Sequence, residues 1–260
     1  MWIASFNING IKARAGQLPK WLEEAQPDVA VLQEIKSSDE TFPRGLIEDL
    51  GYNLETHGQK GFNGVAILSK RPMFDVSRGL PGDPEDAQAR WIEASVEGDH
   101  GAVRVCGLYL PNGNPAPGPK YDYKLAWMAR LQARAADLIA SEEIAVMGGD
   151  YNIIPQAEDA ARPDAWREDA LFRLESRDAF RRIMTLGFTD ALRATTNAAE
   201  TYTFWDYQAG ARQRNDGIRI DHMLLTPQAA DRLTECTIDA HVRDWEKPSD
   251  HVPIRINLDV

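Results

Sequence analysis

The chain has 260 residues, of which 43% are hydrophobic and 27% are charged, a balance typical of globular proteins. This composition excludes a disordered, collagen-like or low-complexity chain, and no apolar run reaches the ~18 residues of a membrane-spanning helix. The 40 acidic and 29 basic residues give a net charge of −11 with neutral histidines. Because nucleic-acid binding usually needs a basic surface, such a protein would bind nucleic acid only through a local basic face and a metal ion.

The N-terminus and the cysteines predict a cytoplasmic protein. Residues 1–6 start at once with strand-like sequence and lack the basic region and apolar core of a signal peptide. The two cysteines, Cys106 and Cys236, are too few for a disulfide framework, and Cys106 lies in an apolar run that predicts a buried free thiol. We therefore expect a reducing environment and no membrane association.

Apolar residues predict short strands mixed with amphipathic helices. Helical spacing predicts a helix over residues 11–25 that ends before Pro27, a longer helix over 125–138, and a third that stops at Gly187. Strands often follow one another in pairs, which favours a mixed sheet or sandwich over a repeated βαβ fold. The predicted strands are residues 2–6, 28–32, 64–69, 91–96, 103–110, 144–147, 202–205, 219–225, 236–240 and 253–258.

Residues 111–119 contain four prolines and two glycines, which exclude regular structure there. This segment either joins two half-domains or forms a functional loop. The first predicted strand is not followed by a G-x-G-x-x-G sequence, and the chain has no P-loop sequence, so nucleotide-cradling folds lack support.

Polar residues cluster at the ends of the predicted strands, where layered α/β proteins build their sites. Each alone has an ordinary interpretation; Asp150, for example, follows two glycines and is typical of a turn or helix N-cap. Turn requirements do not select two acids and a histidine at separate strand ends, however, so one shared cleft is the stronger interpretation. The residues concerned are Asn7, Asn9, Glu34, Tyr109, Asn112, Asp150, Asn152, Asp221, Asp250 and His251.

Seven short segments around these residues follow a familiar order. They are Ser5-Phe-Asn-Ile-Asn-Gly10, Leu32-Gln-Glu-Ile-Lys36, Tyr109-Leu-Pro-Asn-Gly113, Gly149-Asp-Tyr-Asn-Ile153, Thr203-Phe-Trp-Asp-Tyr207, Arg219-Ile-Asp-His222 and Ser249-Asp-His-Val-Pro253. In these segments the chain resembles the exodeoxyribonuclease III family, the bacterial-type AP endonucleases and exonucleases of the endonuclease/exonuclease/phosphatase superfamily. Any one segment is weak, but seven in order from residue 5 to 253 are specific.

The resemblance implies an α/β protein with one domain over residues 1–260. The expected fold is a DNase I-like four-layer sandwich, in which two packed mixed sheets are flanked by helices. Residues 111–119 would then form a loop beside the active site and not a domain boundary.

The resemblance also implies a metal-assisted phosphodiesterase. Mg²⁺ prefers oxygen ligands, and Glu34 is the first choice, with Asp250 and the amide of Asn9 nearby; Mn²⁺ is expected to substitute. Because some family members have Asp where this chain has Asn9, a second metal site stays open. Lys36 would support the metal-binding carboxylate or contact a phosphate.

The implied catalytic roles divide between water activation and phosphate binding. Asp150 would orient or deprotonate the water, with Asn7 fixing its carboxylate and Asn152 holding the phosphate or the water. His251 would face the phosphate while Asp221 holds its other ring nitrogen. Tyr109 and Asn112 would donate hydrogen bonds to phosphate oxygens.

DNA recognition is expected to rest mostly on phosphate contacts and shape. Phe204, Trp205, Ile218 and Ile220 would form an apolar pocket for a deoxyribose without its base, with Ile218 where human-type enzymes have Trp. Three arginines would supply the basic face: Arg212, Arg214 and Arg219.

The expected protein is therefore a Mg²⁺-dependent DNA-repair enzyme of the cytoplasm that acts at the nucleoid. It would cleave duplex DNA 5′ to abasic sites and have 3′→5′ exonuclease and 3′-phosphatase activity. We expect a monomer that binds DNA with abasic sites or blocked 3′ ends, without an obligate protein partner. The alternatives are a superfamily phosphoesterase for phospholipids or inositol phosphates, and a non-catalytic DNA-binding relative.

Overall fold

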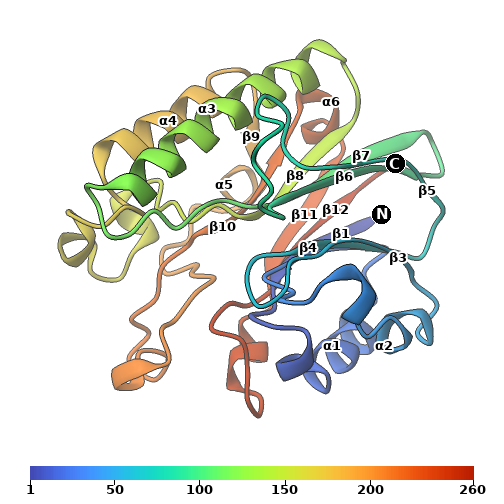
Figure 1. The fold of residues 1–260 in the computed structure, drawn as a ribbon, viewed down its shortest axis with the longest axis horizontal. Coiled ribbons are helices and arrows are strands. Elements are labelled where there is room, and N and C mark those ends of the chain that lie inside the picture. The colour runs from blue at the N-terminus through green and yellow to red at the C-terminus, as the bar shows by residue number, and fades with distance from the viewer.

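Two six-stranded sheets pack face to face in the computed structural model, which covers residues 1–260 (Figure 1). The strand orders are β11-β12-β1-β2-β4-β3 in the first sheet and β5-β6-β7-β8-β10-β9 in the second. Each sheet has one parallel pair, β1 with β2 and β7 with β8, among antiparallel neighbours. The expected mixed sandwich is thereby confirmed.

The strands of the first sheet are β1 (Trp2–Asn7), β2 (Val29–Gln33), β3 (Asn53–His57), β4 (Val65–Ser69), β11 (Leu233–Ile238) and β12 (Ile254–Leu258). Those of the second are β5 (Met73–Arg78), β6 (Trp91–Glu97), β7 (Ala102–Tyr109), β8 (Ala145–Asp150), β9 (Thr189–Asp190) and β10 (Asp221–Leu225). The helices are α1 (Gln17–Ala25), α2 (Gly45–Glu48), α3 (Pro119–Ala140), α4 (Leu174–Met184), α5 (Ala191–Thr195) and α6 (Pro227–Ala230).

Helices cover the outer faces of both sheets, which gives four layers (Figure 1). Strand side chains alternate between two apolar layers, because successive residues point to opposite faces. In β2, Val29 and Val31 pack between the sheets, whereas Ala30 and Leu32 pack toward α1. Strands buried on both faces have nearly continuous apolar sequences, which made them predictable. No helix combines the length and apolar character that crossing a membrane requires.

One predicted strand, residues 202–205, is absent, although every other predicted strand overlaps an observed one. The N–H of Phe204 donates to the carbonyl of Ile218, whereas the N–H of Trp205 donates to the carbonyl of Asp250. The segment thus bonds to a different neighbour at successive residues and forms only isolated bridges. It cannot continue as a strand of either sheet.

Residues 111–119 link β7 to α3. Both elements belong to the half of the molecule built on the second sheet, so this segment is a loop and does not separate half-domains (Figure 1). Both cysteines are free, and Cys106 is buried as expected.

A buried cluster of ion pairs fixes the start of β10. Arg219 is 1% exposed, and its guanidinium bonds to Asp159 (Nε–Oδ1 2.7 Å) and Asp190 (Nη1–Oδ2 2.7 Å). It also lies 3.0 Å from Nδ1 of His222, whose pKa is lowered to about 4 by burial and by this cation. The expectation that Arg219 contacts DNA is therefore wrong, since its charge neutralises buried carboxylates.

We predict that Arg219→Met lowers the free energy of unfolding by about 3–5 kcal/mol, because the change leaves buried carboxylates without their cation. Urea denaturation followed by circular dichroism measures the loss. Arg212→Met is the matched control: its partner Asp244 is 59% exposed, so no buried charge is left unpaired, and we expect a loss within about 1 kcal/mol. Equal small losses in both variants would contradict the role assigned to the buried cluster.

Candidate active site

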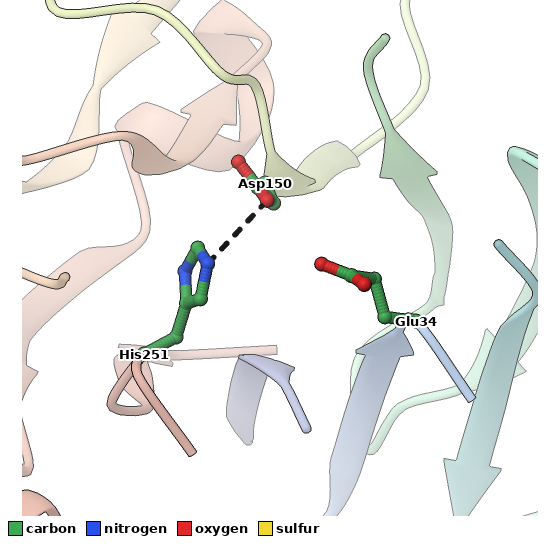
Figure 2. Close-up of side chains that lie close together, drawn as sticks. All are labelled: Glu34, Asp150 and His251. Atoms are coloured by element: carbon green, nitrogen blue, oxygen red, sulfur yellow. Dashed lines mark ion pairs between the residues drawn. The ribbon is translucent and has the colours of Figure 1, made fainter. Parts of the chain in front are cut away.

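The strand ends bring the predicted polar residues to one edge of the sandwich. Asn7 ends β1 and Glu34 follows β2 in the first sheet, while Asp150 ends β8 in the second. Asp221, the first residue of β10, pairs directly with Asp150 across the antiparallel ladder. Figure 2 shows the side chains of Glu34, Asp150 and His251 converging on one space.

These residues line a cleft of about 220 Å³. Its lining residues are Glu34, Tyr109, Asn112, Asn114, Asp150, Asn152, Trp166, Leu171, Phe204, Asp206, Ile220, Asp250 and His251. Backbone conformation helps to turn side chains into it: Asn9, Glu34 and Asn152 have φ values of +47°, +49° and +47°. Such left-handed conformations are uncommon outside glycine and concentrate at functional sites.

Tight packing fixes the end of β8. A Cβ atom on Gly149, the residue before Asp150, would overlap the carbonyl oxygen of Leu108 on the neighbouring strand β7. Only glycine therefore allows β7 and β8 to approach each other here, and Tyr109 pairs with Asp150 at the end of both strands.

The amide of Asn7 joins carboxylates from both sheets. Its Nδ2 donates to Glu34 Oε1 and to Asp150 Oδ2, each at 2.9 Å, so the expected bond to Asp150 is present. Burial raises the pKa of Glu34, but hydrogen bonds from Asn7 and Lys36 outweigh it and hold the pKa below its ordinary value. Burial instead raises the pKa of Asp150 well above its ordinary value.

His251 lies between two buried carboxylates. Its Nδ1 is 2.8 Å from Asp221 Oδ2, and its Nε2 is 3.7 Å from Asp150 Oδ2, the contact drawn in Figure 2. Burial disfavours the charged ring, yet Asp221 and Asp150 overcome this effect and raise the pKa of His251 to about 10. The ring is thus a buried cation, and the expected Asp–His pair is formed.

Lys36, Asn9 and Asp250 form a second group beside the first. Lys36 Nζ lies 2.9 Å from Glu34 Oε2 and also donates to Asn9 Oδ1, so of its two expected roles it takes the support of Glu34. Asn9 Nδ2 donates to Asp250 Oδ1 at 3.0 Å. Because the amide oxygen of Asn9 faces an ammonium group, the expectation that Asn9 is a metal ligand is not met in this arrangement.

Tyr109 and two asparagines form the opposite wall. Burial, with the Glu34 and Asp150 carboxylates, raises the pKa of Tyr109 well above its ordinary value, so the phenol stays a hydrogen-bond donor. Asn112 Nδ2 donates to Asn152 Oδ1 at 3.1 Å, and Asn152 Nδ2 donates to a backbone carbonyl at 2.9 Å. The side-chain amide of Asn152 therefore bonds to other groups of the protein through both Oδ1 and Nδ2, and its Oδ1 orients Asn112.

The expected apolar pocket is only partly formed. Phe204 packs edge-on against His251, with ring centroids 5.0 Å apart, and Ile220 also lines the cleft. Ile218 lines an adjoining cavity of about 290 Å³ that shares Phe204 with the cleft. Trp205 is buried elsewhere and lines a separate cavity of about 640 Å³, so its assignment to the pocket is wrong.

The remaining two arginines differ in surroundings. Arg212 binds Asp244 (Nη2–Oδ2 2.7 Å), stacks 4.6 Å from the Trp205 ring centroid, and lines the separate cavity. Arg212 thus lines a cavity separate from the cleft, which argues against the phosphate contact expected of it. Arg214 is about half-exposed and lines the adjoining cavity.

Some lining residues were not among the predicted site residues. Trp166 and Leu171 come from the irregular stretch between β8 and α4, and Asp206 follows the misassigned segment at 202–205. No strand end or local motif marks the first two. Asp206 lies inside a segment that carried the resemblance, which was the one signal available for it.

The donor set of the cleft fits a divalent cation. Oxygens of Glu34 and Asp150 and a ring nitrogen of His251 lie within 4.8 Å of one another. His251 is engaged by Asp221 and is cationic, which leaves the two carboxylates as donors of the type that Mg²⁺ prefers. Burial holds these carboxylates close together, and a cation between them would relieve their repulsion.

We predict that His251 of the metal-free protein stays protonated throughout pH 6–9 and titrates near pH 10. In Asp221→Asn its pKa falls, by on the order of one to two units, since one carboxylate is lost. Ring ¹⁵N chemical shifts in NMR titrations measure both values. His222, neutral above about pH 4, serves as the internal control. A neutral His251 at pH 7 in the unmodified protein would contradict this assignment.

Comparisons with known proteins give one answer. Residues 4–251 match the Endonuclease/Exonuclease/phosphatase family. Exodeoxyribonuclease III of Haemophilus influenzae is 38% identical over 98% of both chains. An AP endonuclease from Archaeoglobus fulgidus superposes with a TM-score of 0.94 at 38% identity, covering all of both chains. The 3′ phosphatase NExo from Neisseria, solved with a product DNA hairpin, superposes with a TM-score of 0.95 at 36% identity, again over both full chains. The chain therefore belongs to the exodeoxyribonuclease III group of the Endonuclease/Exonuclease/phosphatase family.

Proposed function

We propose that the protein is a metal-dependent DNA-repair phosphodiesterase of the exodeoxyribonuclease III type. It cleaves duplex DNA 5′ to abasic sites and removes nucleotides and phosphates from 3′ ends. The observation that carries this proposal is the continuous set of contacts Asp221–His251–Asp150–Asn7–Glu34 in one cleft. The relatives named as exodeoxyribonuclease III, AP endonuclease and 3′ phosphatase support the DNA substrate.

Glu34 would hold a Mg²⁺ ion, with Asp250 at the rim of the same cleft. When bound, this ion supplies Lewis-acid stabilisation of the negative charge on the phosphate. Lys36 keeps Glu34 ionised and oriented toward the cleft. Mn²⁺ substitutes for Mg²⁺, because it also binds carboxylate oxygens.

Asp150 is the proposed general base. Burial moves its pKa toward neutrality, where a carboxylate accepts a proton most effectively at physiological pH. Asn7 fixes one carboxylate oxygen, and the backbone N–H of Asn152 donates to the other at 2.9 Å. Asp150 can therefore orient a water molecule and take its proton.

His251 is the proposed electrostatic partner of the phosphate. As a cation with Nδ1 held by Asp221, it can donate from Nε2 to a phosphate oxygen as negative charge develops there. Tyr109 and Asn112 provide further donors from the opposite wall. Phe204, Ile218 and Ile220 supply the apolar surface for a sugar without a base.

The substrates are abasic sites and blocked 3′ ends in duplex DNA, and the enzyme works as a monomer without an obligate protein partner. Its place is the cytoplasm, at the nucleoid. The relatives with DNA-repair names and the site geometry support this assignment over one to phospholipids or inositol phosphates.

The decisive assay uses a labelled duplex with one central abasic analogue. We expect internal nicking on its 5′ side with Mg²⁺ or Mn²⁺, none in EDTA, and recovery when metal is restored. Glu34→Gln should lower kcat by about 10²–10³-fold with an unchanged fold, because a metal-binding charge is lost. Inositol phosphate and phospholipid substrates run in parallel. Cleavage of those alone, or full DNA cleavage in EDTA, would overturn the proposal.

DNA binding should depend on Arg214 and not on Arg212. We expect Arg214→Ala to lower the slope of log K against log salt concentration by about one, the effect of losing one phosphate contact. Arg212→Ala should leave the slope unchanged, since its side chain is only 23% exposed and lines a cavity separate from the cleft. Fluorescence anisotropy at several salt concentrations, in EDTA to prevent cleavage, gives the slopes. Identical slopes for all three proteins would remove Arg214 from the DNA-binding surface.

A further inference from the structure

A lysine side chain is buried next to the cleft wall without a role in the chemistry described above. Lys124 lies in the second turn of α3, with no exposed surface. Burying an ammonium group is unfavourable unless hydrogen bonds compensate. Burial lowers the pKa of Lys124 to about 7, although the Asp150 and Asp169 carboxylates oppose the shift. Helix packing alone would be served better by an apolar residue.

The ammonium group joins two loops that build the cleft. Its Nζ donates to the backbone carbonyl of Asn112 at 3.0 Å and to that of Asn152 at 2.6 Å. The first carbonyl belongs to the proline-rich loop after β7, and the second to the loop after β8. Both asparagines line the cleft, so Lys124 contacts the backbone of two cleft residues without entering it.

The same two residues are also joined through their side chains. Asn112 Nδ2 donates to Asn152 Oδ1 at 3.1 Å, while Asn152 Nδ2 donates to the carbonyl of Leu110 at 2.9 Å. A side-chain amide has two N–H donors, so Asn112 keeps one for a ligand. The direction of that donor depends on the backbone position of Asn112, which Lys124 helps to fix.

The loop packs directly on the lysine side chain. A Cβ atom on Gly113, which has φ of +91°, would lie 2.6 Å from Cδ of Lys124 and 3.1 Å from Cβ of Ala170. Only glycine fits between them. Loop and lysine therefore move together, and a change in one displaces the other.

We propose that Lys124 is a positioning residue, which acts through the carbonyls of Asn112 and Asn152 to aim the free N–H of Asn112 at a phosphate oxygen of the substrate. The inference rests on the proposed function, because the phosphate belongs to that DNA substrate. A donor displaced by about 1 Å loses much of its effect on the transition state, which corresponds to rate losses of up to ~10²-fold.

The first test is a double-mutant cycle with kcat as the readout. Lys124→Met keeps the length of the side chain and removes its donors, and we expect kcat to fall about 10- to 100-fold while KM changes little. In an Asn112→Ala background the same change should lower kcat less than about twofold, since the group that Lys124 positions is gone. Equal losses in both backgrounds, or a Lys124→Met kcat within twofold of the unmodified enzyme, would overturn the proposal.

Leu131→Ala is the matched control, because Leu131 is buried on the same helix, in the core between α3 and the second sheet. It should lower the melting temperature, and any effect on kcat should be equal in both backgrounds. Should Lys124→Met not fold, Lys124→Gln takes its place, because it retains N–H donors on a shorter side chain. That variant should show a smaller loss with the same dependence on Asn112; a loss independent of Asn112 would contradict the proposal.

A second readout separates this inference from the proposed function. The side-chain NH₂ resonances of Asn112 in ¹H–¹⁵N spectra report its orientation without any substrate. We expect them to shift in Lys124→Met and to stay in place in Leu131→Ala. If the unmodified protein cleaves no DNA, the proposed function fails, but the resonances still test Lys124. Unchanged Asn112 resonances in Lys124→Met would overturn the positioning role.

Discussion

The structure depends on the balance of charge where the two sheets meet. Glu34, Asp150 and Asp221 bring three carboxylates close together at this edge, and their mutual repulsion would separate the strand ends without compensation. His251 supplies a cation between two of them, and the Asn7 amide bonds one carboxylate of each sheet. The same arrangement that holds the sheets together at this edge also keeps the Asp150 carboxylate and the His251 ring side by side.

The locations of the basic residues change how the net charge of −11 is interpreted. Arg219 pairs with two buried acids of the protein and Arg212 pairs with Asp244, so both cations offset charge within the chain. If the chain binds DNA as proposed, the attraction must come from cations other than the buried Arg219.

The apolar pattern predicted most of the core strands and the polar residues at their ends, whereas the two-sheet arrangement was implied by the family resemblance. Each site residue comes after or before an apolar run that is buried on both faces, as with Glu34 after β2 and Asp150 at the end of β8. The edge strands β3, β5 and β9 were not predicted, since exposure or shortness removes that pattern. Fold and site were thus predictable where burial leaves a recognisable pattern of apolar residues in the sequence.

Residues whose environment is made by distant segments could not be placed in this way. Arg219 lies between buried isoleucines, but its partners Asp159 and Asp190 stand 60 and 29 residues away. Trp205 points away from the cleft because its segment bonds to different neighbours at successive residues. Lys124 is buried in α3, but because lysine is a polar residue its sequence position did not predict this burial. In each case the neighbouring residues in the sequence do not distinguish the side chain's actual environment from that of an exposed residue.

Because Asp150 and Asp221 sit at strand ends that pair with each other, the stretch beyond Ile153 can change length without moving these two side chains. The stretch between β8 and α4, which brings Trp166 and Leu171 to the cleft, is long and irregular, whereas Asp150 at its start is fixed by the β-ladder. Insertions there would reshape the substrate opening and leave the catalytic centre intact. Evolution of new substrate ranges on this scaffold is therefore a matter of loop exchange, and recombination of the intervening loops offers a direct route to redesigned specificity.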